Sequence, residues 1–250
     1  MLDLIKMNDS EFKRIKNKIF KIDHTRYWGD DYDVRFYLIS IIKELKKKRI
    51  IDVGGGVGII SSELDESNDR INLDLSFEDL KKCKTHSPEI NNICASITHL
   101  PIKENSIDIV IGASVLEYVK LIDLENNNVM KGNLIKKYPT IEKSLFEISC
   151  IMKKSGLLYL TTPNNAYYNG NKLEYDELKK HVEQFFQKND FYFFNTFPRL
   201  SKKYRKLNLA NIVPKILSKI KSHQKIIDSL ISKDKGVKKK SVSFFVKAFN

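Results

Sequence analysis

A cluster of glycine and acidic residues near residue 50 carries the clearest chemical signal in this sequence. Residues 52–58 read Asp-Val-Gly-Gly-Gly-Val-Gly and follow the short run 49–51, which we expect to form a buried strand. Asp74 closes a second strand-like run, 71–73. A strand, a glycine turn, a helix and an acid after the next strand make up a nucleotide-binding half-fold. Glycine lets the backbone approach a ligand closely, and the acid can accept hydrogen bonds from ribose hydroxyls.

The spacing of the glycines indicates which nucleotide is bound. A dinucleotide site requires G-x-G-x-x-G, but Ile59 occupies the position of the third glycine, and we expect a helix through Ile59, Ile60 and Leu64. The pattern here is D-x-G-x-G-x-G. It resembles motif I of the class I S-adenosylmethionine-dependent methyltransferases.

Five further segments resemble the same family and keep its order along the chain. They are 72–76 ("G-x-D-x-S"), 99–110 ("LPF…sFDxV"), 114–119 ("vLeHv"), 145–156 ("L-x-E-i-x-R-v-L-K-P-G-G") and 158–164 ("ittPN"). Each segment is unspecific alone. Together, across about residues 49–164, they are specific to the family but not to one acceptor.

The resemblance implies that S-adenosyl-L-methionine is the cofactor and that a defined set of residues binds it. That set is Asp52, Gly54, Gly55, Gly56, Gly58, Asp74, Leu75, Ser96, Ile97 and Gly112. One position departs from the family, because an acid often stands four residues before the Leu-Pro pair and here that residue is Ser96. A serine hydroxyl can still accept a hydrogen bond from the adenine amino group.

The bulk composition limits the class of protein. A chain of 250 residues that is 42% hydrophobic suits one domain with additions, and no apolar run is long enough to predict a transmembrane helix. The N-terminus has no signal-peptide core. The three cysteines are far apart, so we expect reduced, mostly buried thiols and a cytoplasmic protein without a metal site.

Alternating strand and helix patterns predict an α/β fold with a parallel sheet. The family resemblance implies a Rossmann-like doubly wound seven-stranded sheet whose last strand is antiparallel. The expected strands are 49–53, 70–74, 91–94, 107–112, 156–161, 191–196 and 243–248. Helices are expected over 10–22, 33–47 and 173–187. The chain then divides into an N-terminal helical segment or lid (1–48), a methyltransferase core (49–198 plus 241–250) and an insertion (199–240).

The insertion concentrates the positive charge. The chain has a net charge of +13, and residues 199–240 hold fourteen basic residues against two acidic ones. Apolar residues recur there at helical intervals, which predicts a basic helical cap. Three interpretations stay open: the apolar stripe docks on the protein's own sheet, it meets an anionic membrane or a lipid-type acceptor, or it contacts nucleic acid. The scarcity of aromatic residues makes nucleic acid the less favoured partner.

Candidate acceptor-side residues come from aromatic loops and from titratable side chains. Tyr27 and Trp28 are candidate lid residues, although Trp28 would equally pin the N-terminal helix to the core. Tyr167 and Tyr168 follow the fifth strand and are candidates for the acceptor pocket. The candidate catalytic bases are His181, Tyr118 and Glu117.

These observations favour a methyltransferase acting on an oxygen or nitrogen nucleophile of a small-molecule or lipid-type acceptor. The sulfonium methyl group is already activated, so alignment and exclusion of water matter more than one shared catalytic residue. The alternatives are an RNA methyltransferase and a non-catalytic protein that keeps the fold for binding. The oligomeric state has no sequence signal.

Overall fold

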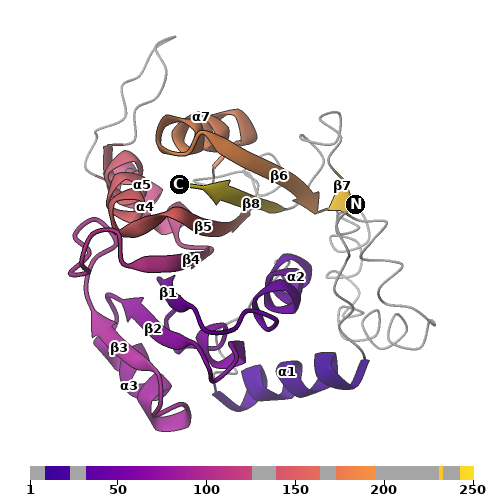
Figure 1. Ribbon diagram of the computed structural model, residues 1–250. Coiled ribbons are helices and arrows are strands. Elements are labelled where there is room, and N and C mark those ends of the chain that lie inside the picture. The colour runs from indigo at the N-terminus through magenta and orange to yellow at the C-terminus, as the bar shows by residue number, and fades with distance from the viewer. Residues whose placement is uncertain (1–8, 23–31, 126–138, 164–172, 195–230, 233–242) are drawn as a thin grey trace.

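A computed structural model describes residues 9–22, 32–125, 139–163, 173–194, 231–232 and 243–250. Within these ranges the chain forms one eight-stranded sheet with helices on both faces (Figure 1). The order of the strands is β3-β2-β1-β4-β5-β8-β6-β7. Their bounds are β1 Arg49–Val53, β2 Asp69–Asp74, β3 Asn91–Cys94, β4 Ile107–Ala113, β5 Met152–Pro163, β6 Lys188–Phe194, β7 Ile231–Ser232 and β8 Ser243–Phe249.

The strand directions confirm the expected doubly wound sheet. Strands β3, β2, β1, β4 and β5 pair in parallel, and β8 is antiparallel to both of its neighbours, β5 and β6. Strand β6 therefore runs in the same direction as β5. The seven expected strands all form, and the last long strand is the antiparallel one.

The alternation of side chains along each strand explains why both faces are covered. In β5, Leu158 and Leu160 belong to one buried cluster, whereas Tyr159 belongs to the cluster on the opposite face. Strands buried on both sides are typical of parallel sheets between helical layers. The core therefore lies in two layers that share the sheet as their common wall.

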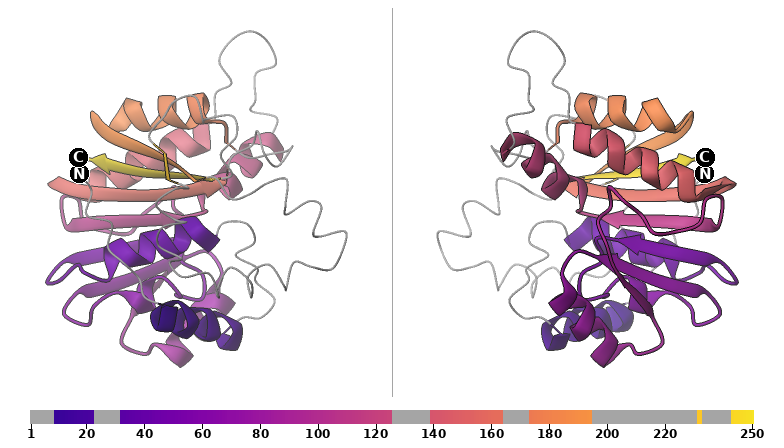
Figure 2. Two further views of the ribbon diagram at one scale, coloured as in Figure 1. Left: turned by 90° about the vertical axis from the view of Figure 1, so that its right-hand side faces the viewer. Right: turned by 90° about the vertical axis from the view of Figure 1, so that its left-hand side faces the viewer.

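The helices divide between these two faces. Their bounds are α1 Asp9–Ile22, α2 Tyr32–Ile42, α3 Phe77–His86, α4 Leu116–Glu125, α5 Pro139–Ile151 and α7 Tyr175–Phe185. Helices α4, α5 and α7 supply the first cluster, while α1 and α2 supply the second. Figure 2 shows the two faces in turn, with α1 and α2 in front in the left view and α5 in front in the right view.

Three expectations about secondary structure are corrected. The segment after the glycine turn forms only a 3₁₀ helix, Ser61–Glu63, because Gly58 still has a left-handed φ of 73° and Leu64 is already extended. The second N-terminal helix ends at Ile42, short of residue 47, where Lys47 has a φ of 54°. Within the expected helical insertion, Ile231–Ser232 is a strand that pairs with the end of β6. The rest of 199–240 lies outside the described residues.

Two further expectations concern bulk properties. The three cysteines are all free thiols, but the expectation that they are mostly buried is wrong: Cys83 is buried, Cys150 is half-buried and Cys94 is exposed. No helix in the described ranges combines the length and the apolar character needed to cross a bilayer.

Candidate cofactor site

A cavity of about 740 Å³ opens where the parallel strands end at their carboxyl termini. Four strands contribute to it: β1 through the glycine turn, β2 through Asp74, β3 through the segment 95–98, and β4 through 113–115. In an open α/β sheet this edge is where ligands bind. The volume lies within the range of small-molecule and cofactor pockets.

The glycine turn shapes one wall of this cavity. Gly54, Gly56 and Gly58 all have positive φ, at 71°, 55° and 73°. A Cβ atom on Gly54 would lie 2.5 Å from Cγ2 of Val115, and one on Gly55 would lie 2.1 Å from Oδ1 of Asn72. The turn therefore needs glycine for its backbone conformation and for its close packing.

Asp74 and Asn72 tie the glycine turn to strand β2. The N–H of Gly56 donates to Oδ2 of Asp74 at 2.8 Å, and the N–H of Ser76 donates to Oδ1 at 2.8 Å. The amide of Asn72 donates to the carbonyl oxygen of Gly56 at 3.0 Å. Each carboxylate oxygen of Asp74 keeps a second lone pair for a ligand hydroxyl.

Asp52 is buried beneath the same turn, and its carboxyl group has a raised pKa. Burial raises its pKa to about 7, and the nearby charge of Asp74 acts in the same direction. A 2.9 Å hydrogen bond from the Ser61 hydroxyl and the positive charge of Arg35 oppose this rise. The other oxygen, Oδ1, has no hydrogen-bond partner among the described residues. A buried carboxylate oxygen without a partner can accept a hydrogen bond from a ligand.

The end of β3 contributes a polar turn to the opposite wall. The Ser96 hydroxyl lies 2.8 Å from the Thr98 hydroxyl and accepts a 3.2 Å hydrogen bond from the backbone N–H of Thr98. Ser96, Ile97 and Leu75 all line the cavity. The sequence-based expectation that Ser96 and Ile97 lie beside an adenine ring stays a prediction.

Ser114 is a site residue that the sequence reasoning missed. It follows β4, is buried, and has a φ of 58° although it is not a glycine. Its N–H donates to the carbonyl oxygen of Thr161 at 2.8 Å, while its Oγ has no hydrogen-bond partner in the described chain. Backbone strain next to an unpartnered hydroxyl in a cavity points to a functional position. Its place directly after the fourth strand was the available sequence signal.

The structure does not bring all the expected residues to this cavity. Gly58 and Gly112 do not line it. A Cβ atom added at Gly58 would lie 2.3 Å from Sγ of Cys83, and one added at Gly112 would lie 2.7 Å from a methyl carbon of Leu160. Both positions therefore serve close packing. Tyr27, Trp28, Tyr167 and Tyr168 lie outside the described residues.

Of the candidate bases, only Tyr118 reaches the cavity, and its side chain is 66% exposed. His181 is buried where α7 packs on α5, with Nδ1 3.6 Å from Oε1 of Glu142, and burial lowers its pKa. Glu117 is also buried and accepts a 3.3 Å hydrogen bond from the Thr162 hydroxyl. His181 was a candidate base only if it faced the pocket, and it does not line this cavity, because its helix turns the side chain toward α5.

Comparison with known proteins identifies the domain that holds this cavity. Residues 51–160 match the family model described as a methyltransferase domain. This match places a methyltransferase domain over residues 51–160, and the fold of the chain is that of the class I S-adenosylmethionine-dependent methyltransferases. The matched range runs from strand β1 into β5 and so contains the glycine turn, Asp74, Ser96 and Ser114.

Two curated relatives of this chain are matched over part of their length. A malonyl-[acyl-carrier protein] O-methyltransferase of Hamiltonella defensa is 30% identical over 113 residues, which are 44% of each chain. An uncharacterized protein of Methanocaldococcus jannaschii is 30% identical over 127 residues, which are 50% of this chain and 46% of that protein. The chain thus spans about half the length of the curated relatives that it matches.

Solved methyltransferase structures share the fold at low sequence identity. A SAM-dependent methyltransferase of Archaeoglobus fulgidus superposes with a TM-score of 0.55 at 16% identity, covering 94% of this chain and 99% of that one. Phosphoethanolamine N-methyltransferase 2 of Haemonchus contortus, solved with S-adenosyl-L-methionine, superposes with a TM-score of 0.53 at 13% identity, covering 97% of this chain and 57% of that one. At these identities the likeness concerns the fold alone.

The residues of this cavity fit S-adenosylmethionine, the cofactor that the family resemblance implies. The cofactor carries an ammonium group, and Asp52 offers a buried carboxylate oxygen without a partner in the described chain. It also carries a ribose, and Asp74 offers a carboxylate beside the glycine turn. The glycine turn lines the same cavity, and its close packing against Val115 and Asn72 leaves no room for a Cβ atom at Gly54 or Gly55.

Proposed function

We propose that this chain transfers the methyl group of S-adenosylmethionine to an oxygen or nitrogen nucleophile of a small-molecule or lipid-type acceptor. The observation that carries the proposal is the coincidence of the matched domain with the cavity at the strand ends, where Asp52 and Asp74 flank the glycine turn. A protein that used the fold only as a scaffold would not need this arrangement of carboxylates.

The chain's own residues have three tasks in this reaction. When bound, the cofactor supplies a methyl group whose leaving group is a neutral thioether. Asp52 and Asp74 hold the charged and hydroxylated ends, so that the reacting centre is fixed. The walls formed by Ile97 and Val119 are apolar and exclude water. The remaining task is to orient the acceptor.

Exposed side chains around the cavity support an acceptor with an apolar part. Leu75 and Tyr118 are each 66% exposed and Ile122 is 43% exposed, and all three line the cavity. The Tyr118 hydroxyl, on a residue that lines the cavity, is the candidate to orient an acceptor or to take its proton. A curated relative is named as an O-methyltransferase, which favours an oxygen nucleophile.

The basic segment 199–240 is proposed to act on the acceptor rather than on the cofactor. Strand β6 delivers the chain to the same edge of the sheet that carries the cavity, because β6 runs parallel to β5. Deleting 202–228, which spares the paired strand β7, should leave cofactor affinity within a few fold. A large loss of cofactor affinity in a folded deletion variant would contradict this division of roles.

Two measurements test the proposed function. Calorimetric titration with S-adenosylhomocysteine should detect one site, and this site should be weakened in Asp74→Ala. Incubation with S-adenosylmethionine and a panel of thioester-linked carboxylates, phenols and amines should release S-adenosylhomocysteine with one of these classes, as followed by mass spectrometry. Absence of binding for both cofactor forms would overturn the proposal.

A further inference from the structure

Helix α3 starts at the cofactor cavity and returns to the glycine turn at its far end. The N–H of Ser76, the residue before α3, donates to Oδ1 of Asp74 at 2.8 Å. Further along the helix, Cys83 is buried against Gly58, where an added Cβ atom would lie 2.3 Å from its Sγ. The last residue of the helix, His86, reaches the same turn. One helix therefore contacts both Asp74 and the glycine turn.

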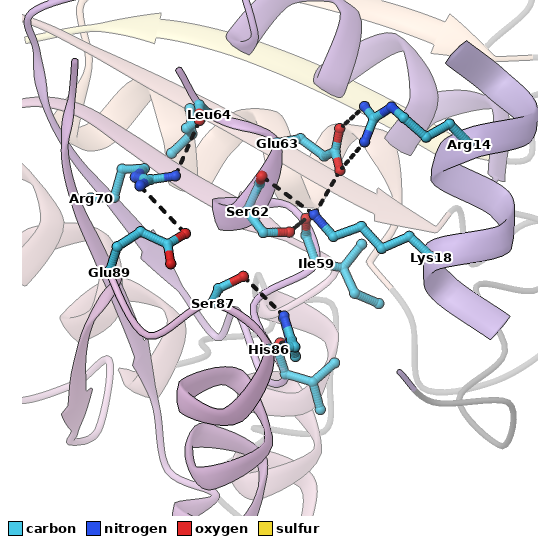
Figure 3. Close-up of polar contacts among 11 residues, drawn as sticks. Arg14, Lys18, Ile59, Ser62, Glu63, Leu64, Arg70, His86, Ser87 and Glu89 are labelled. Atoms are coloured by element: carbon cyan, nitrogen blue, oxygen red, sulfur yellow. Dashed lines mark hydrogen bonds and ion pairs between the residues drawn. The ribbon is translucent and has the colours of Figure 1, made fainter. Parts of the chain in front are cut away.

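The imidazole of His86 is held at both of its nitrogen atoms. Its Nε2 lies 2.6 Å from the carbonyl oxygen of Val57, and its Nδ1 lies 2.9 Å from the hydroxyl of Ser87 (Figure 3). Because a carbonyl oxygen only accepts, Nε2 carries the proton, and the Ser87 hydroxyl can donate to Nδ1. This tautomer makes His86 a hydrogen-bond donor to the backbone of the glycine turn.

The Val57 carbonyl belongs to a peptide unit whose orientation local conformation does not fix. The next residue is Gly58, whose φ is 73°, and glycine occupies positive and negative φ about equally well. A peptide unit before glycine can therefore turn over at little conformational cost. Two hydrogen bonds oppose this rotation: the N–H of Gly58 donates to the carbonyl oxygen of Gly55 at 2.9 Å, and the carbonyl oxygen of Val57 accepts from His86. Of these two bonds, the one from His86 comes from outside the turn.

The orientation of this peptide unit affects the wall of the cofactor cavity on both sides. Before it, the N–H of Gly56 donates to Asp74 at 2.8 Å, and after it Ile59 lines the cavity, as does Val57 itself. A peptide unit is planar, so turning it over moves its oxygen and its N–H together. The rotation would break the bond made by the Gly58 N–H and change the path of the chain into Ile59.

The chain that follows the turn is held by other contacts. The Ser62 hydroxyl donates to the carbonyl oxygen of Ile59 at 2.7 Å, and Nζ of Lys18 on α1 lies 3.0 Å from the buried carboxylate of Glu63. Figure 3 shows that side chains from α1 and from the end of α3 converge on this loop. Removing the donor of His86 should therefore release one peptide unit while the rest of the loop stays in place.

We propose that His86 is a positioning residue of the cofactor site, which holds the Val57–Gly58 peptide in the orientation that receives S-adenosylmethionine. This inference rests on the proposed function, because it assigns a role within that cofactor site. His86 does not line the cofactor cavity, so it acts through the glycine turn and not by contact with the cofactor. Cofactor affinity should therefore depend on a donor at the position of Nε2 and not on the aromatic ring or on Nδ1.

Two substitutions of His86 in the full chain test this dependence by calorimetric titration with S-adenosylhomocysteine. The amide nitrogen of glutamine can occupy the position of Nε2, whereas that of asparagine reaches only the position of Nδ1. His86→Gln should bind within about twofold of wild type, since it keeps a donor to the Val57 carbonyl oxygen. His86→Asn should bind roughly 3- to 12-fold more weakly, the effect of losing about one neutral hydrogen bond.

Thr85 provides the matched control for helix propensity. It precedes His86, is exposed, and donates from its hydroxyl to the carbonyl oxygen of Lys81 at 2.9 Å, within α3. Asparagine and glutamine differ in helix propensity, so Thr85→Asn and Thr85→Gln measure this difference at the neighbouring position, away from Val57. The two control variants should bind S-adenosylhomocysteine within about twofold of each other.

Amide hydrogen exchange of the ligand-free protein, followed by NMR, gives a second readout that does not depend on the cofactor. The Gly58 amide should exchange faster in His86→Asn than in His86→Gln, because a released peptide unit no longer keeps its bond to Gly55. Equal affinity or equal Gly58 exchange in the two variants of His86 would overturn this role alone. A wild-type protein that binds no S-adenosylhomocysteine would overturn the proposed function and this role together.

Discussion

The backbone N–H of Gly56 donates a 2.8 Å hydrogen bond to Oδ2 of Asp74. This bond joins the glycine turn after β1 to the end of β2, two elements separated by 18 residues in sequence. The other oxygen of Asp74 accepts from the N–H of Ser76 at 2.8 Å. Asp74 therefore shapes the turn and presents its carboxylate to the cavity, so its loss should affect both.

Replacing Asp74 by alanine should weaken binding of S-adenosylhomocysteine. A hydrogen bond to a charged group contributes about 1.5–3 kcal/mol, which corresponds to roughly 10- to 150-fold in Kd. Calorimetric titration of wild type and variant measures the change. Asp69→Ala is the matched control, because Asp69 begins the same strand but pairs with Arg49 at 3.0 Å at an exposed position. Equal affinities for wild type and Asp74→Ala would remove Asp74 from the site.

Asp52 should make the stability of the cofactor-free protein depend on pH. Burial raises its pKa from 3.8 to about 7, so between these values the folded state holds a proton that the unfolded state has released. The stabilisation from this proton is complete below the unfolded pKa and is lost as pH rises through the folded pKa. The free energy of unfolding of wild type relative to Asp52→Asn should therefore fall by up to about 1.4 kcal/mol per pH unit between roughly pH 4 and 7.

Urea unfolding of both proteins across this pH range measures the difference. Subtracting the variant removes the contribution of the other carboxylates, which are common to both proteins. A difference that rises with pH would mean that Asp52 is stabilised as the carboxylate in the folded state.

The same ionisation should control cofactor affinity. The ammonium group of S-adenosylhomocysteine favours ionised Asp52, so wild-type affinity should increase as pH rises from about 6 to 8, through the pKa near 7. Asp52→Asn should bind more weakly above pH 7 and should lose this rise. Calorimetry in buffers of equal ionic strength checks both statements, and parallel pH profiles for the two proteins would exclude Asp52 as the ammonium partner.

Ser96→Asp should keep or increase cofactor affinity. The turn accepts the change, because an aspartate oxygen can take the 3.2 Å hydrogen bond that the Thr98 N–H now makes to the Ser96 hydroxyl. The second carboxylate oxygen can then accept from the adenine amino group, as the family resemblance implies. Ser96→Ala is the comparison variant, and calorimetry with S-adenosylhomocysteine ranks the three proteins. An affinity for Ser96→Asp below that of Ser96→Ala would place the adenine elsewhere.

The fold was predictable from sequence because its signal is local. Apolar runs such as Ile107 to Ala113 are buried on both faces of the sheet, and the strands formed where these runs occur. The glycine turn and Asp74 were predictable because close backbone packing restricts those positions to particular residue types. Ser96, Ile97 and Leu75 also line the cavity, since they follow strand ends that meet at one edge.

The rest of the site could not be predicted, because it depends on contacts between distant parts of the chain that no local sequence pattern reveals. The partner of Asp52 is Ser61, which was expected in a helix and lies instead at the start of a short 3₁₀ turn. His181 turned toward Glu142 because the packing of α7 on α5 decides its direction.

Two substitutions of Ser114 should separate the effect of its backbone strain on stability from the effect of its hydroxyl on ligand binding. Its φ of 58° is unfavourable for any residue with a Cβ atom, so Ser114→Gly should be more stable than Ser114→Ala by about 0.5–1 kcal/mol. Both variants remove an Oγ that has no hydrogen-bond partner in the described chain and that belongs to a cavity-lining residue. If this hydroxyl binds the ligand, both should bind S-adenosylhomocysteine roughly 2- to 12-fold more weakly than wild type, the range for a neutral hydrogen bond.

Urea unfolding without ligand and calorimetry with ligand provide the two readouts. Ser106→Ala is the matched control, because the Ser106 hydroxyl donates to the carbonyl oxygen of Lys103 before β4 and lies outside the cavity. Unfolding reports the strain, which glycine relieves and alanine keeps. Binding reports the hydroxyl, which both variants lack, so equal weakening in the two assigns Oγ to the ligand. Wild-type affinity in both variants would leave Ser114 a strained residue of the turn without a part in binding.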